Sequence, residues 1–132
     1  MSSAASLTHS SPIPRGRAAL IALWVVQIAL AGMFLLAGGS KLLGAPAMVA
    51  LFDTIGIGQW FRYVTGLVEV GSALALLTPR FAAFGALALV PTMIGAVATQ
   101  VIIVGASPVP PAILLLGAAI VVMTRRHELF GA

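Results

Sequence analysis

The sequence predicts an all-α polytopic membrane protein built as a bundle of four transmembrane helices. Of its 132 residues, 61% are hydrophobic and 8% are charged, whereas a soluble domain carries about 25% charged residues. The apolar residues gather in long runs that Gly- and Pro-containing breaks separate. Because so few charges cannot cover a surface that faces water, lipid is expected to contact much of the chain.

The first predicted span follows a polar segment at the N-terminus. Residues 1–16 are rich in Ser, Ala and Pro, and we expect a disordered cytoplasmic tail there. The apolar run from about Ala18 to Leu43 is long enough to cross a membrane. A signal peptide is the alternative, because Arg15 and Arg17 precede the run. The run is longer than a signal-peptide core, however, and the charged Lys41 lies at its end. We therefore predict an uncleaved helix.

A short helix is predicted between the first and second spans. After the break at Gly44-Ala45-Pro46, apolar residues recur at helical spacing over residues 47–55. This segment is too short to span a membrane, so an interfacial helix is expected. It is followed by the aromatic cluster Trp60, Phe61 and Tyr63. Such clusters are typical of the boundary between membrane and water.

Three further spans are predicted, at residues 62–78, 81–104 and 110–124. The tight turn Thr78-Pro79-Arg80 makes the second and third spans antiparallel neighbours. Pro91 removes a backbone donor inside the third span and is expected to kink it. The membrane domain is thus expected to cover residues 17–126, with a short cytoplasmic tail at residues 127–132.

The positions of the basic residues predict the orientation of the chain. With the N-terminus inside, the cytoplasmic segments hold Arg15, Arg17, Arg80, Arg125 and Arg126. The opposite side holds Lys41 and Arg62. The positive-inside rule therefore predicts that both termini are cytoplasmic, in the cell's inner (plasma) membrane. These residues are scattered at the ends of apolar runs, so the net charge of +4 does not indicate nucleic-acid binding.

Glu69 is the strongest candidate for a functional residue because it lies inside the second span. A charge near mid-membrane costs about 2.5–3.5 kcal/mol on insertion scales, so it needs a partner. Lys41 lies at a similar depth and is the preferred partner. Arg62 is the second candidate, on the same helix face as Glu69 but about 10 Å away along the axis. A structural ion pair and a ligand- or proton-binding site both remain open at this point.

Small and polar side chains around this pair could form a narrow pocket. The candidates to line it are Gln27, Gly38, Tyr63, Gly66 and Gln100. Ordinary packing of small residues between helices is the alternative. The chain has no cysteine, and its two histidines, His9 and His127, lie far apart in the sequence. No metal site and no intrinsic cofactor are therefore expected.

Two short motifs resemble elements of the DoxX-like family of membrane proteins. The run Ala37-Gly38-Gly39-Ser40-Lys41-Leu42 resembles the family's AGxxK element, and Tyr63 to Val70 resembles its Y-x-x-G-x-x-E element. The resemblance covers about Arg17 to Arg126. It carries over to Lys41, Gly66 and Glu69, and secondarily to Gly38 and Tyr63. Family members often have a histidine near the end of the third helix, where this chain has Ala98-Thr99-Gln100.

The resemblance implies a four-helix membrane bundle and a link to redox complexes. Some members are subunits of quinone-linked sulfur oxidation complexes, and others associate with detoxification assemblies. We therefore expect an accessory subunit that contacts the lipid bilayer, a partner subunit or a second copy, and a quinone or lipid. One alternative is an oxidoreductase subunit that contacts quinone directly, as in thiosulfate oxidation. Another is a small-molecule- or lipid-binding protein or a transporter. Whether the chain is an enzyme is left open.

Overall fold

The computed structural model describes residues 12–130. In this part of the chain, helices are joined by short turns and there is no strand. The α-helices are α2 (Pro12–Leu42), α3 (Pro46–Ile55), α4 (Trp60–Leu76), α5 (Ala82–Thr99) and α6 (Val109–Arg125). A π-helical turn, η2 (Gln100–Val104), extends α5, and a 3-10 turn, η3 (Arg126–Phe130), follows α6. The predicted all-α fold class is confirmed for this part of the chain.

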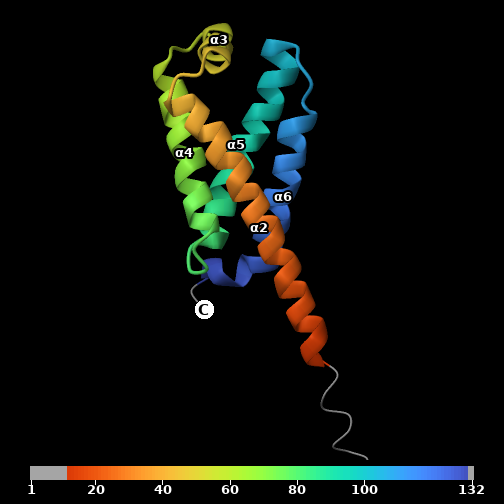
Figure 1. Cartoon of the computed structure of the whole chain (residues 1–132). Coiled ribbons are helices and arrows are strands. Elements are labelled where there is room, and N and C mark those ends of the chain that lie inside the picture. The colour runs from red at the N-terminus through yellow and green to blue at the C-terminus, as the bar shows by residue number, and fades with distance from the viewer. Residues whose placement is uncertain (1–11, 131–132) are drawn as a thin grey trace, which may run out of the picture.

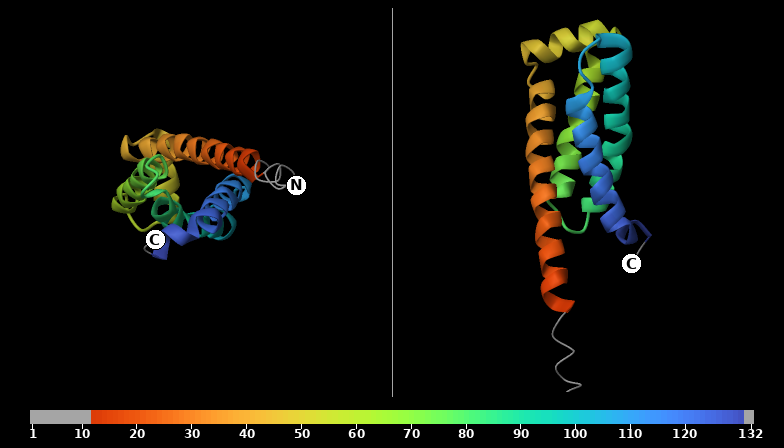
Figure 2. Two further views of the ribbon diagram at one scale, coloured as in Figure 1. Left: turned by 90° about the horizontal axis from the view of Figure 1, so that it is seen from below. Right: turned by 90° about the vertical axis from the view of Figure 1, so that its right-hand side faces the viewer.

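Four of these helices run lengthwise through the molecule, and α3 lies across one end (Figure 1). The turn between α4 and α5 lies at the opposite end, as does η3. In sequence order, α2 packs on α4, α4 on α5, and α5 on α6. The N-terminal part of α2 extends beyond the other helices (Figure 2, right).

The surface of this arrangement fits a lipid environment. The stretches Gly16–Leu42, Ala82–Val104 and Val109–Leu129 are long and apolar enough to cross a membrane. Outward-facing Leu36 is 73% exposed and Ile102 is 79% exposed, and many other large apolar side chains are similarly open. Apolar exposure on this scale is rare on soluble monomers. The chain is therefore a helical membrane protein that contacts lipid.

Glycine allows α2 and α4 to approach each other closely. A Cβ atom built on Gly38 would lie 2.8 Å from the Val70 Cγ2 atom and 2.9 Å from the Gly66 carbonyl oxygen. A Cβ atom on Gly66 would in turn lie 3.0 Å from the Gly38 carbonyl oxygen. Only two residues without side chains can make this backbone contact. The contact fixes the position of α2 along the axis of α4.

Some helix boundaries differ from the expected ones. The first helix begins at Pro12, so the last residues of the expected tail are helical, while residues 1–11 lie outside the described part. The short helix expected over residues 47–55 corresponds to α3. At the other end, residues 127–130 belong to η3. The helix α5 continues through Pro91 as far as Thr99 before it widens into η2.

Candidate ligand-binding site

An ion pair joins the last turn of α2 to the middle of α4. The Lys41 Nζ atom lies 2.8 Å from the Glu69 Oε1 atom. The Glu69 side chain is 1% exposed and the Lys41 side chain is 13% exposed. A carboxylate so deeply buried among apolar groups is stable only beside a counter-charge. The ammonium group of Lys41 supplies it.

The glycine contact between the two helices places this pair. Gly38 lies one turn before Lys41 on α2, and Gly66 lies one turn before Glu69 on α4. A Cβ atom on Gly38 would also lie 3.0 Å from the Glu69 Cβ atom. The backbone that carries the carboxylate is therefore held directly against α2. This close approach lets the lysine side chain reach the carboxylate.

The pair has hydrogen-bonding capacity that the described residues do not use. The Glu69 Oε2 atom is buried and has no hydrogen-bond partner among them. An ammonium group has three donors, and in the described part of the chain Lys41 directs one of them to Glu69. Buried polar groups are normally satisfied. The pair therefore has one acceptor and two donor positions available to a further polar group.

A pocket of about 550 Å³ lies beside the ion pair, between α2, α4, α5 and α6. The helix α3 contributes Met48, Leu51, Phe52 and Ile55 to the lining of the pocket. Its walls are mainly apolar and include Phe34, Phe52, Phe61, Val68, Met93 and Leu114. Sites for small organic ligands occupy about 300–1,000 Å³ and combine apolar walls with a few polar groups. The size and lining of this pocket match that description.

The other polar groups that line the pocket already have partners. The hydroxyl groups of Thr65, Thr92 and Thr99 donate to backbone carbonyls of their own helices at 2.8–2.9 Å. The Gln100 side-chain amide donates to the Ser107 carbonyl at 3.2 Å. Among the described lining residues, Lys41 is the charged one with N–H groups still free to donate, while the Gln100 amide keeps one further neutral N–H. A ligand would receive its strongest hydrogen bond from Lys41.

Arg62 does not pair with Glu69, although it was the second candidate for that role. Its Nη1 group donates to the backbone carbonyl of Lys41, and its Nε group donates to the Gln59 Oε1 atom at 2.7 Å. The guanidinium carbon lies 4.3 Å from the centre of the Tyr63 ring. Arg62 therefore holds the end of α2 that carries Lys41, without lining the pocket itself.

One comparison with known proteins identifies the family of the chain. The sequence pattern of the DoxX-like family matches residues 25–124. This chain belongs to the DoxX-like family. The match confirms the resemblance seen in the motifs at Lys41 and Glu69. No curated protein and no solved structure matches the chain.

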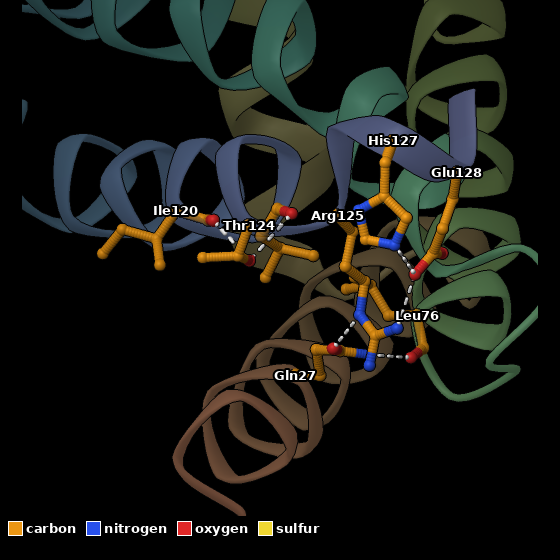
Figure 3. Close-up of polar contacts among 8 residues, drawn as sticks. Gln27, Leu76, Ile120, Thr124, Arg125, His127 and Glu128 are labelled. Atoms are coloured by element: carbon orange, nitrogen blue, oxygen red, sulfur yellow. Dashed lines mark hydrogen bonds and ion pairs between the residues drawn. The ribbon is translucent and has the colours of Figure 1, made fainter. Parts of the chain in front are cut away.

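In this DoxX-like protein, Gln27 does not line the pocket and lies beside the C-terminal ends of α4 and α6. Its Nε2 group donates to the Leu76 carbonyl at 2.8 Å, and its Oε1 atom accepts from Arg125 Nε at 2.6 Å (Figure 3). Arg125 also pairs with Glu128 at 2.8 Å, and its guanidinium carbon lies 5.3 Å from the Trp24 ring centre. Gln27 thus belongs to a second polar cluster that ties α2, α4 and α6 together.

Of the other residues expected to line the pocket, Gln100 does so and Gly38, Gly66 and Tyr63 do not. Gly38 and Gly66 form the contact between α2 and α4, and Tyr63 is 48% exposed. Among residues 12–130, no three His, Asp or Glu side chains lie close enough to hold a metal ion. The sequence did not indicate that the apolar face of α3 lines the pocket.

Proposed function

We propose that this protein is an accessory subunit of a membrane redox assembly, of the quinone-linked or detoxification type. Its task is to bind a quinone, or a lipid-like molecule with a similar carbonyl head. The observation that carries the proposal is the buried pair of Lys41 and Glu69 in the wall of an apolar pocket of about 550 Å³. An apolar pocket with one charged donor group selects a ligand that is mostly apolar and carries an acceptor.

A quinone has the complementary chemistry. Its carbonyl oxygens accept hydrogen bonds, and its ring and isoprenoid tail are apolar. An N–H group of Lys41 would donate to one carbonyl, while Glu69 keeps the ammonium charged. Aromatic side chains such as Phe34, Phe52 and Phe61 would pack on the ring and tail. The quinone itself supplies electron transfer when bound, and the protein supplies binding and orientation.

We also propose four spans with both termini in the cytoplasm, in the cell's inner membrane. Basic residues at Arg17, Arg80, Arg125 and Arg126 lie towards one end of the molecule, and Lys41 and Arg62 lie towards the other. The end richer in Lys and Arg is expected to be cytoplasmic. The helix α4 has 17 residues, the lower limit for a span. The pocket then lies in the outer half of the membrane.

A binding experiment tests the proposed ligand. The full chain is purified in mild detergent, co-purified quinones and lipids are identified by mass spectrometry, and decylubiquinone is titrated. The double variant Lys41→Met/Glu69→Leu replaces the pair with apolar residues of similar size, and Arg80→Gln removes an exposed charge at the opposite end. Saturable binding is expected for the wild type and for Arg80→Gln, with about tenfold weaker binding for the double variant. Absence of saturable wild-type binding would contradict the proposal.

A second experiment tests the role as a subunit. The chain is tagged, isolated from native membranes and analysed for other membrane proteins. Co-isolation of a redox enzyme subunit is expected. The isolation of an empty chain without a partner would argue against an accessory role, whatever the pocket binds in vitro.

A further inference from the structure

We propose that Arg62 is a positioning residue for the pocket, acting through the backbone of Lys41 and through α3. This inference rests on the proposed function, because it concerns the same pocket. Arg62 is 5% exposed, yet it is absent from the pocket walls. Its role must therefore come from the groups that its guanidinium holds.

The first of these groups is the carbonyl of Lys41. Carbonyls in the last turn of a helix lack intrahelical partners. Here the Gly44 amide donates to the Lys41 oxygen over a long distance of 3.3 Å. Arg62 Nη1 donates to the same oxygen. Gly44 has a φ of +72°, and a Cβ atom there would lie 3.4 Å from Arg62 Nη1. The positive φ favours glycine in this turn, and the guanidinium packs against it.

The second group is Gln59, which connects Arg62 to α3. The Gln59 Oε1 atom accepts from Arg62 Nε at 2.7 Å. The Gln59 Nε2 group donates to the Val49 carbonyl at 3.0 Å and to the Asp53 Oδ1 atom at 2.7 Å. Both of these acceptors lie on α3. One buried guanidinium therefore connects α2, α3 and α4.

These bonds fix two parts of the pocket at once. The Lys41 backbone determines where the ammonium lies, and α3 contributes Met48, Leu51, Phe52 and Ile55 to the wall. A lysine at position 62 could not replace the arginine, because the planar guanidinium directs separate N–H groups at two acceptors, whereas an ammonium is a single point of charge. Arg62 therefore holds the Lys41 ammonium and α3 in fixed positions relative to each other.

A double-mutant cycle on ligand affinity tests whether Arg62 acts through the pair. Arg62→Gln and Arg62→Lys are made in the wild type and in the Lys41→Met/Glu69→Leu background, and decylubiquinone is titrated into each. Arg62→Gln is expected to weaken binding about tenfold in the wild type and about threefold or less without the pair. Arg62→Lys is expected to recover only part of the loss. Equal losses in both backgrounds would overturn the route through Lys41, and a lowered melting temperature with unchanged affinity would overturn the inference as a whole.

A second measurement requires no ligand. Because the chain has no cysteine, nitroxide labels can be attached only to cysteines introduced at the exposed positions Leu36 on α2 and Ala50 on α3. The distance distribution between them is expected to broaden in Arg62→Gln and to stay unchanged in Arg80→Gln. An unchanged distribution in Arg62→Gln overturns the positioning role. A broadened distribution in a protein that binds no quinone would overturn the proposed function and leave the positioning role standing.

Discussion

Arg125 on α6 donates a 2.6 Å hydrogen bond from its Nε group to the side-chain oxygen of Gln27 on α2. Both side chains are buried, and 98 positions in the sequence separate them. The Gln27 Nε2 group donates a hydrogen bond to the carbonyl of Leu76 at the end of α4. Three helices thus meet at one glutamine, which does not line the pocket.

Replacing Gln27 with leucine should destabilise the protein without removing ligand binding. The variant leaves the Arg125 Nε group and the Leu76 carbonyl without their partner, at a cost of about 1–3 kcal/mol. A lowered unfolding midpoint in detergent is the expected result. Gln100→Leu is the matched control for stability, since the half-buried Gln100 makes one bond of 3.2 Å, to the Ser107 carbonyl. Equal midpoints for the two variants would show that the cluster at Gln27 contributes little.

Removing Lys41 alone should be more harmful than removing Lys41 and Glu69 together. Lys41→Met leaves a carboxylate that is 1% exposed without its counter-charge, which costs about 3–5 kcal/mol. Lys41→Met/Glu69→Leu removes both charges and should restore most of that stability. Glu69→Leu alone should lie between the two, because a lysine near a helix end can extend towards the interface. Unfolding midpoints and protein abundance measure this order.

The same variants separate the structural role of the pair from its binding role. If the double variant is stable and still binds decylubiquinone as tightly as the wild type, the pair serves only helix packing. If it is stable and binds weakly, the pair acts on the ligand. A double variant less stable than Lys41→Met would contradict the description of the pair as a compensated buried charge.

Neighbouring glycines on α2 should respond oppositely to alanine. In Gly38→Ala the new Cβ atom would lie within 3.0 Å of three atoms of α4, so a loss of about 1–3 kcal/mol is expected. In Gly39→Ala the new atom has nothing within 4 Å. That variant should be neutral or more stable by up to about 1 kcal/mol, because alanine favours the helix. Similar midpoints for the two variants would contradict the close contact between α2 and α4.

Cysteine labelling can establish the orientation in the membrane. Single cysteines are introduced at Thr78, between α4 and α5, and at Ser107, between α5 and α6. In intact spheroplasts, an impermeant maleimide should label the cysteine at position 107 and should reach position 78 only after permeabilisation. The wild-type chain, which lacks cysteine, is the control for background labelling. The reverse pattern, or labelling of both positions from outside, would contradict the proposed orientation.

Local features of the sequence predict most of the helical layout. Long apolar runs, the break after Leu43 and the short segment over residues 47–55 each have a counterpart in the structure, because these signals depend on neighbouring residues. The start of α2 at Pro12 was not anticipated. Proline suits the first turn of a helix, but the polar composition of the segment outweighed that signal.

The partners of polar side chains were harder to predict, because they depend on how the helices pack. Arg62 was expected to be a possible partner of Glu69 by its spacing along one helix, yet it donates to the Lys41 carbonyl of another helix. Gln27 shares a helix with Lys41, but it lies four turns away and faces Arg125. Periodicity identifies a helix face and does not show which neighbour covers it.

The contact at Gly38 makes the length of the segment that follows it as important as its composition. One residue inserted between Gly38 and Lys41 would rotate the lysine by about 100° around the axis of α2. The ammonium would then point away from Glu69, even though every residue of the pair and of the glycine contact was still present. This short segment can therefore accept substitutions far more readily than insertions or deletions.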